Sequence, residues 1–259
     1  MFVDSHCHLD RLEWDKLQLE LPEVVERAQQ AGVEHMLCVS VSLAEFPAMA
    51  ELVAPYPMVS VSCGEHPLHQ TAALDAELLL RLCQAPEVVA VGETGLDFYY
   101  AADSKAVQQE AFAQHIDVAC QLRKPLIIHT RDARADTLAL MRAGQASHAG
   151  GVLHCFTESW EMAKAALDMG FYISISGIMT FKNAVELREV VKKLPLDALL
   201  IETDSPYLAP VPQRGKTNQP AYVAHVAEAI AELKGVSLQQ LAAQTTDNFY
   251  RLFSGAKPA

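Results

Sequence analysis

Two histidines near the start of the chain, His6 and His8, are the first side chains that could bind a metal ion together. They follow an apolar run, residues 1–3, and one residue separates them. Side chains of an extended strand alternate between its two faces, so these imidazoles are expected to point to the same side. Two imidazoles leave an ion under-coordinated. The rest of the chain should therefore supply further histidines and carboxylates.

Five more polar side chains follow apolar runs in the same way. Each ends a short segment that is typical of a buried strand; they are His66, Glu93, His129, His154 and Asp204. One histidine at a strand end is more often a structural group than a ligand. A whole set at matching positions is better explained by a shared metal site, because buried polar groups need partners. Glu202 lies on the same strand face as Asp204 but deeper, so we predict that it orients a neighbour.

The size of this set predicts two divalent ions rather than one. Four histidines, a glutamate and an aspartate exceed the needs of one four-coordinate ion. Glu93 is the predicted bridge, and Gly92 and Gly95 would allow the backbone to bend close beside it. The two predicted ligand sets are His6, His8, Glu93 and Asp204 for one ion, and Glu93, His129 and His154 for the other. The imidazoles favour Zn²⁺, Mn²⁺ or Fe²⁺, whereas phosphate chemistry often uses Mg²⁺.

Hydrolysis is the chemistry that such a centre predicts. Two ions about 3.5–4 Å apart lower the pKa of a shared water and supply hydroxide near neutral pH. Asp204 is the predicted general base, and Glu93 is the second carboxylate at the reacting centre. A serine or cysteine nucleophile is not expected, because the chain has no GxSxG motif. Cys155 directly follows His154, so strand alternation would point its thiol away from the ions.

A weaker signal predicts that the substrate is a phosphate ester. Arg131 lies two residues beyond a predicted ligand and is expected to face the same cleft. Arg214, Lys216 and Asn218 lie in the segment APVPQRGKTNQP, a stiff loop after the last strand, where barrels often bind phosphate. Solvated loop cations are the alternative for Arg214 and Lys216. The predicted substrate-binding residues are His66, Arg131, Arg214 and Asn218.

The elements that must position these residues alternate between strand and helix. Short β-branched runs precede helical patterns, as in parallel strands joined by crossover helices. The predicted strands are residues 2–5, 33–39, 58–63, 88–91, 125–128, 152–153, 171–174 and 198–201. The predicted helices are residues 22–31, 43–53, 75–84, 104–123, 132–143, 158–169, 183–193, 221–234 and 237–251. We predict an α/β fold, a (β/α)8 TIM barrel in a single domain over residues 1–259, with an extra C-terminal helix. The last two helices are expected to cover the barrel wall.

Composition favours a soluble, cytoplasmic protein with no membrane partner. Apolar residues make up 51% of the chain, and no apolar run approaches the roughly 18 residues of a membrane span or has the pattern of a signal peptide. The six scattered cysteines are expected to be thiols. The net charge of −12 opposes general binding to nucleic-acid backbones, although bound cations and local arginines could invert the potential in one cleft. A monomer is favoured over an oligomer.

The other histidines are expected to be structural or solvated; they are His35, His69, His115, His148 and His225.

Seven segments of the chain resemble motifs of the TatD-type metal-dependent hydrolases, a branch of the amidohydrolase-like barrels. In order, they are DSHCHLD, CGEHP, VGETGLD, IHTR, LHCF, IETDSPYL and NQP, and they span essentially the whole chain. The resemblance implies a (β/α)8 barrel, a binuclear divalent site and hydrolysis of DNA phosphodiesters. The ligands that it implies are His6, His8, Glu93, His129, His154 and Asp204. It also implies that His66 contacts substrate or solvent at the site.

Three functions remain in view. The leading hypothesis is a deoxyribonuclease that acts on DNA ends or short oligonucleotides, because an acidic surface can make few phosphate contacts with long duplex. The alternative is hydrolysis of a carboxylic ester or amide, such as an aminoacyl-tRNA ester, since the same hydroxide attacks carbonyl carbon. A metal-bound scaffold without activity is the third, and the complete ligand set argues against it. Metal identity, cleavage polarity and the choice between DNA and RNA stay open.

Overall fold

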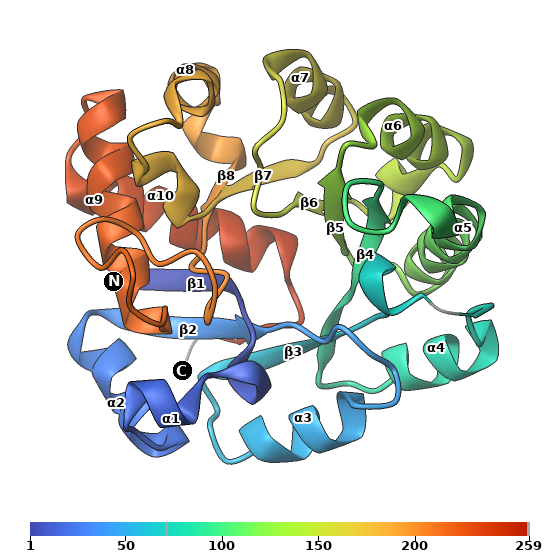
Figure 1. Ribbon diagram of the computed structural model, residues 1–259, viewed down its shortest axis with the longest axis horizontal. Coiled ribbons are helices and arrows are strands. Elements are labelled where there is room, and N and C mark those ends of the chain that lie inside the picture. The colour runs from blue at the N-terminus through green and yellow to red at the C-terminus, as the bar shows by residue number, and fades with distance from the viewer. Residues whose placement is uncertain (71, 258–259) are drawn as a thin grey trace.

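The computed structural model of the protein describes residues 1–70 and 72–257. Its centre is one sheet of eight parallel strands that follow one another in space in their sequence order. The strands are β1 (Phe2–Cys7), β2 (Val33–Cys38), β3 (Val59–Cys63), β4 (Val88–Asp97), β5 (Leu126–Arg131), β6 (Gly151–Leu153), β7 (Tyr172–Ile175) and β8 (Leu199–Ile201). The sheet curls until the segment after β8 meets β1, where the N–H of Asp204 donates to the carbonyl of His6 at 2.9 Å. The predicted TIM barrel is confirmed (Figure 1).

Helices surround this ring of strands (Figure 1). They are α1 (Trp14–Leu17), α2 (Leu21–Gln30), α3 (Phe46–Val53), α4 (Ala76–Cys83), α5 (Lys105–Leu122), α6 (Arg134–Ala143), α7 (Trp160–Asp168), α8 (Val185–Lys193), α9 (Val223–Lys234) and α10 (Leu238–Leu252). Short 3₁₀ helices lie between them: η1 (Leu9–Arg11), η2 (Pro67–His69), η3 (Ala102–Ser104), η4 (Ala146–His148), η5 (Gly177–Thr180), η6 (Leu196–Ala198) and η7 (Pro220–Tyr222). All nine predicted helices are present, and α1 and the 3₁₀ helices were not predicted.

Local sequence explains where several helices begin. The side chains of Asp75, Ser159 and Ser237 accept hydrogen bonds from backbone N–H groups in the first turns of α4, α7 and α10. These caps satisfy donors that have no partner inside the helix. Helix α3 begins at Phe46, later than predicted, with a proline in its first turn, where its missing N–H costs nothing. None of the helices in the described ranges is long and apolar enough to span a membrane.

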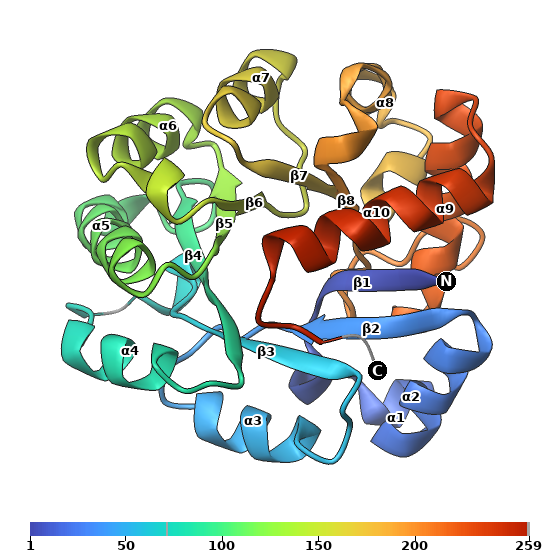
Figure 2. The ribbon, with the colours of Figure 1, turned by 180° about the vertical axis from the view of Figure 1, so that it is seen from behind.

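The barrel interior has an apolar core of its own, separate from the core between strands and helices. Val3, Leu37 and Leu200 face this interior, and Phe249 and Phe253 of the C-terminal segment pack against them. Figure 2 shows α10 lying across this end of the barrel. The prediction that the last two helices cover the wall is right for α9 and wrong for α10. An open barrel end would expose apolar side chains to water, and α10 covers them.

Strand β4 is longer than predicted, and the predicted ligand Glu93 lies within it rather than after it. It continues past Val91 to Asp97, and all of its residues are buried. Gly95 has a φ of +135°, and a Cβ at this position would lie 2.0 Å from the carbonyl oxygen of His129 on β5. Glycine therefore allows β5 to pair with the second half of β4. As a result Glu93 and His129 lie within paired strands, which fixes their separation.

Buried His115 supports the loop that carries one of the predicted site residues. Its Nδ1–H donates to the carbonyl of Ala111 at 2.7 Å, and its Nε2 accepts from the N–H of Glu65 at 3.1 Å. Both ring nitrogens are used by a neutral imidazole, and burial lowers the pKa of His115 to about 4. The structural role predicted for His115 agrees with these contacts, because they anchor the backbone next to His66.

This burial predicts a loss of stability in acid. The unfolded ring takes up a proton near pH 6.5 and the folded ring only near pH 4, so the unfolded state binds more protons between these values. The contribution of this residue to the free energy of unfolding should therefore fall by about 3 kcal/mol as pH drops through that window. Urea unfolding in the presence of chelator would measure it. His115→Gln should reduce the pH dependence and His225→Gln, on α9, should not; equal curves for the wild type and His115→Gln would contradict the prediction.

Candidate metal centre

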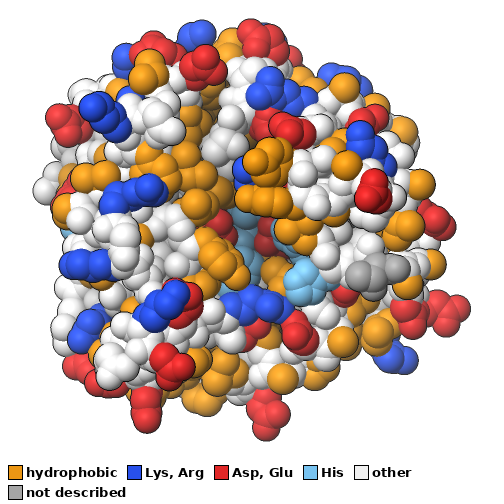
Figure 3. Space-filling model, viewed as in Figure 1, with side chains coloured by type: hydrophobic (Ala, Val, Ile, Leu, Met, Phe, Trp, Pro, Cys, Tyr) orange, Lys and Arg blue, Asp and Glu red, His pale blue; other side chains and the backbone are white. Residues whose placement is uncertain are grey.

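The predicted ligands come from five places in the barrel and meet at the C-terminal ends of the strands. His6 lies in β1 and His8 just after it, Glu93 lies in β4, and His129 lies in β5, while His154 follows β6 and Asp204 follows β8. Most of them line a cavity of about 470 Å³. Figure 3 shows this hollow, with histidine and acidic side chains at its floor and hydrophobic and cationic side chains around its mouth. The structure thus brings these residues together.

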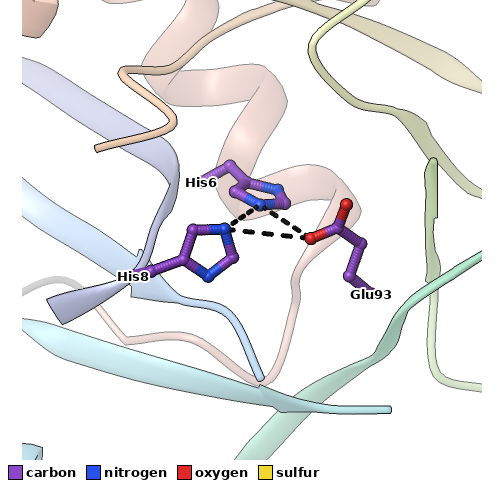
Figure 4. A group of neighbouring side chains, drawn as sticks. All are labelled: His6, His8 and Glu93. Atoms are coloured by element: carbon purple, nitrogen blue, oxygen red, sulfur yellow. Dashed lines mark hydrogen bonds and ion pairs between the residues drawn. The ribbon is translucent and has the colours of Figure 1, made fainter. Parts of the chain in front are cut away.

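One oxygen of Glu93 faces the N-terminal histidines. Its Oε2 lies 3.3 Å from Nε2 of His6 and 3.8 Å from Nε2 of His8. The two Nε2 atoms lie 3.2 Å apart. Figure 4 shows the imidazoles and the carboxylate turned toward one common point. Oδ1 of Asp204 lies 3.5 Å from Nε2 of His8 and 3.8 Å from Nε2 of His6, so a second carboxylate closes this group.

The other oxygen of Glu93 faces a second group of histidines. Its Oε1 lies 2.7 Å from Nε2 of His154, 3.2 Å from Nε2 of His66 and 3.3 Å from Nδ1 of His129. The side chain of Glu93 is almost completely buried. Its two oxygens are therefore shared between two separate sets of imidazole nitrogens, as a bridging carboxylate requires.

In three of the histidines, a hydrogen bond made by the outer ring nitrogen decides which nitrogen carries the proton. Nδ1 of His8 lies 2.8 Å from the carbonyl of Val39, which only accepts, so this nitrogen carries the proton. Nε2 of His129 donates in the same way to Asp97 at 3.1 Å, and Nδ1 of His154 to a carboxylate at 3.3 Å. In the neutral form that can bind a metal ion, each ring presents a lone pair to the centre. Lone pairs directed at carboxylate oxygens repel unless a cation lies between them.

His66 has the opposite tautomer. Its Nδ1 accepts a hydrogen bond from the backbone N–H of Leu68 at 3.1 Å. The neutral ring must then carry its proton on Nε2, the atom that faces Glu93. His66 therefore presents a donor to the centre and not a lone pair. This separates it from the predicted ligands, although its ring is as close to Glu93 as theirs.

One buried atom supports the presence of cations in this donor set. Nε2 of His154 lies 2.7 Å from Glu93 but makes no hydrogen bond in the described chain. Three overlapping groups have ligand atoms that all lie within 4.8 Å of one another; they are His6, His8 and Glu93, then His6, His154 and Glu202, and then His66, Glu93 and His129. Buried polar atoms of this kind are normally satisfied, so the residues fit divalent metal ions.

When no ion lies between them, protonated histidines and ionised carboxylates of the centre stabilise one another's charges. Burial alone would raise the pKa of Glu93, but the histidines around it, His154 and His66 first, hold it well below its usual range. Burial likewise opposes the charge on His154, yet Glu93 and Glu202 raise the pKa of His154 well above its usual value. Burial dominates for His66 and lowers its pKa, in agreement with a neutral donor.

The family of the chain follows from its sequence match. The family described as TatD related DNase matches residues 3–254. The chain belongs to this family. It is 54% identical over 251 residues to YcfH of Escherichia coli K12, named an uncharacterized metal-dependent hydrolase, and the match covers 97% of this chain and 95% of YcfH. The resemblance expected from the sequence motifs is thus confirmed.

Two further relatives place this TatD-family chain among proteins of the same length and fold. It is 37% identical over 238 residues to the 3′-5′ ssDNA/RNA exonuclease TatD of Salmonella typhimurium, over 89% of this chain and 92% of that protein. The crystal structure of YJJV, a TatD homologue of Escherichia coli K12, matches with a TM-score of 0.89 at 28% identity and covers 98% of both chains. The protein is a metal-dependent hydrolase of the TatD family with candidate histidine and glutamate clusters for the metal.

Two carboxylates outside the predicted ligand set orient its histidines. Asp97 contacts Nε2 of His129, and Oε1 of Glu202 lies 3.3 Å from Nδ1 of His154 and accepts the N–H of Cys155 at 2.7 Å. The orienting role predicted for Glu202 agrees with these contacts, whereas the role of Asp97 was not predicted. The missed signal was spacing, since Asp97 follows Glu93 by four residues and shares its face of the strand.

Neutralising Glu202 is expected to weaken metal binding. In Glu202→Gln the new amide side chain would keep the shape of this buried group but lose the charge that favours the Nδ1–H tautomer of His154. Loss of a carboxylate that hydrogen-bonds a metal-binding histidine typically lowers metal affinity about 10- to 100-fold. Calorimetric titration of the metal-free Glu202→Gln variant with Zn²⁺ or Mn²⁺ would measure the change. Glu158→Gln, which removes a buried carboxylate paired with Arg134, is the matched control and should bind normally.

The predicted substrate-binding residues do not all lie at the cavity of this TatD-family protein. His66 and Arg131 line it. Arg214 lies outside, with its guanidinium 3.7 Å from the centre of the Phe181 ring. Asn218 is fully buried, where its amide donates to the carbonyls of Thr203 and Tyr207. Neither Arg214 nor Asn218 lines the cavity, so the substrate contacts predicted for these two residues stay predictions.

Two other residues line the cavity that were not predicted for the site. Cys155 lines the cavity, and its φ is +43°. Its sulfur lies 3.1 Å from the hydroxyl of Ser176, and because β6 ends at Leu153 strand alternation does not set its direction, so the predicted outward orientation of the thiol stays a prediction. Burial raises the pKa of the Cys155 thiol well above its usual value, which agrees with the absence of a cysteine nucleophile. Arg11 was missed; it lines the cavity and pairs with Glu45. All six cysteines are free thiols, as predicted.

Proposed function

We propose that this protein is a nuclease that uses two divalent metal ions to cleave phosphodiester bonds at the ends of DNA strands and in short oligonucleotides. The observation that carries the proposal is the position of Glu93, whose two oxygens face two separate groups of histidines. The name of the Salmonella typhimurium relative, a 3′-5′ ssDNA/RNA exonuclease, supports the substrate class. The net charge of −12 favours strand ends over long duplex, because few phosphates can be neutralised.

The proposed ligands divide between the two oxygens of Glu93. His6, His8 and Asp204 would hold one ion with Oε2, and His129 and His154 would hold the other with Oε1. Bound ions of this kind polarise a phosphoryl oxygen and lower the pKa of water. Asp97, Glu202 and the carbonyl of Val39 fix the rings in the tautomers that this arrangement needs.

The remaining steps belong to side chains that face the cavity. Asp204 keeps the low pKa of a carboxylate, since its hydrogen bond to His8 and the charge of His6 outweigh burial. It accepts the proton of the attacking water as the new P–O bond forms, and returns it to the leaving oxygen as the ester P–O bond breaks. His66 and Arg131 line the cavity, and we assign the Nε2–H of His66 and the guanidinium of Arg131 as donors to phosphate oxygens of a bound substrate.

Elemental analysis combined with digestion of end-labelled oligonucleotides tests the proposal. The purified protein should carry up to two divalent ions per chain, lose activity with chelator and regain it with Mg²⁺, Mn²⁺ or Zn²⁺. The products should carry new phosphate ends. A fully metallated sample that cleaves no oligonucleotide would sink the nuclease proposal. Release of a carboxylic acid from an ester, amide or aminoacyl-tRNA would instead support the alternative hydrolase, and activity on neither class would favour a scaffold.

A further inference from the structure

The mouth of the cavity gathers the exposed aromatic side chains of the protein. In the part of the chain that the structure describes, three aromatic side chains are exposed: Tyr99, Tyr100 and Tyr207. Tyr100 and Tyr207 line the cavity, and the ring of Tyr99 packs edge-on against Tyr100 with 4.7 Å between centroids. Leu68, another exposed apolar residue, lines the same cavity. Exposed apolar groups gathered around a functional cavity indicate a binding surface.

The tyrosine pair is held at a fixed distance from the metal centre. The backbone N–H groups of Tyr99 and Tyr100 both donate to Oδ1 of Asp97, at 3.1 and 2.9 Å. The other oxygen of Asp97 contacts His129 at 3.1 Å. One buried carboxylate thus shapes the turn that carries both rings and orients a predicted ligand. Tyr99 and Tyr100 are 57% and 64% exposed, yet their backbone is anchored.

Arg131 completes this group. Its guanidinium lies 4.3 Å from the ring centre of Tyr99 and 4.7 Å from that of Tyr100. Across the described residues, no carboxylate lies within ion-pair distance of Arg131, whereas the other cavity arginine, Arg11, pairs with Glu45. Stacking on aromatic rings leaves the N–H donors at the edge of a guanidinium free. Arg131 therefore has donors available for a phosphate beside two aromatic faces.

We propose that Tyr99, Tyr100 and Arg131 form a subsite that stacks one unpaired nucleobase and binds the phosphate next to it. The inference rests on the proposed nuclease function and deepens it, because it names the structural feature that would select single strands. Every base has an aromatic face, so stacking of this kind tolerates any sequence. A base inside a duplex already has its faces covered by its neighbours, and exposing it costs free energy. The subsite therefore favours a frayed or single-stranded end.

Binding measurements isolate the role of the base. The probes are a fluorescein-labelled short oligothymidylate and the same strand with tetrahydrofuran abasic residues at the unlabelled end. Fluorescence anisotropy would be measured in the Asp204→Asn background to prevent cleavage. The intact probe should bind about tenfold more tightly than the abasic probe. Tyr100→Ala should remove that difference, Tyr100→Phe should preserve it, and Leu52→Ala, which truncates an exposed side chain of α3, should have no effect.

Cleavage by proteins that retain Asp204 separates this inference from the nuclease proposal. Single-stranded ends should be cut about tenfold faster than blunt duplex ends at low substrate, and Tyr100→Ala should narrow the ratio through KM more than kcat. Equal rates of cleavage for single-stranded and blunt duplex ends would overturn the subsite and leave the nuclease proposal standing. Base-dependent binding without cleavage of any oligonucleotide would support the subsite and contradict the nuclease proposal. If Tyr100→Ala instead dissociates a dimer in gel filtration and keeps the base preference, the tyrosines form a protein interface and the subsite is wrong.

Discussion

Glu93→Gln is expected to remove most of the bound metal and to lower the rate of hydrolysis roughly a thousandfold. The substitution keeps the shape of the side chain but removes the charge that both groups of histidines face. An uncompensated change within a buried charged cluster costs about 3–5 kcal/mol, which corresponds to a roughly thousandfold loss of metal affinity, and the rate should fall with the metal content. Elemental analysis after gel filtration and kcat/KM on an end-labelled oligonucleotide would measure the two effects.

Two variants sharpen the Glu93 prediction. His129→Ala affects only the group around Oε1, so it should lower the metal content to about one ion per chain and leave the other site filled. Glu87→Gln removes an exposed carboxylate just before β4, at the opposite end of the same strand, and should keep both ions. Two ions retained in Glu93→Gln would rule out the bridging role. Two ions retained in His129→Ala would contradict the proposed division of ligands.

Asp204→Asn is expected to reduce kcat by about 10²–10⁴-fold, the usual contribution of a positioned general base. An amide cannot take the proton of the attacking water, although it can still accept hydrogen bonds from the groups around it. The effect on KM should be smaller, because phosphate contacts come from other residues. Steady-state kinetics with metal in excess would separate loss of the base from loss of the nearby ion.

The dependence of kcat on pH gives an independent test of Asp204 as the general base. Contacts with His8 and His6 lower the pKa of Asp204, so the wild type should lose kcat only at acidic pH, as that carboxylate is protonated. In Asp204→Asn this acidic limb should disappear. Asp197→Asn changes an exposed carboxylate in η6, which precedes the N-terminal end of β8. This variant should keep both the wild-type kcat and its loss at acidic pH. Near-normal turnover of Asp204→Asn would favour a scaffold or a different base.

The fold could be predicted because its signals are local and repeat. Strands and helices alternate eight times, and residues two apart in a strand share a face whatever lies around them. That rule placed His6 with His8, and the end of each apolar run located His129 and His154. Strand length was harder to predict. The continuation of β4 to Asp97 depends on the close approach of β5 at Gly95, and the sequence of β4 alone does not state what lies opposite.

The sequence by itself determined the barrel and the six proposed metal ligands that gather at its rim, because hydrophobic periodicity and strand alternation are properties of the chain. Only the tertiary structure decided what each predicted residue can do. The proton on His66 depends on the N–H of Leu68, the orientation of His129 depends on Asp97 of the adjacent strand, and the burial of Asn218 depends on the path of its loop. Hydrogen-bond partners and exposure arise when strands pair in register and loops fold back. Residues far apart in the chain therefore assign chemical roles to one another.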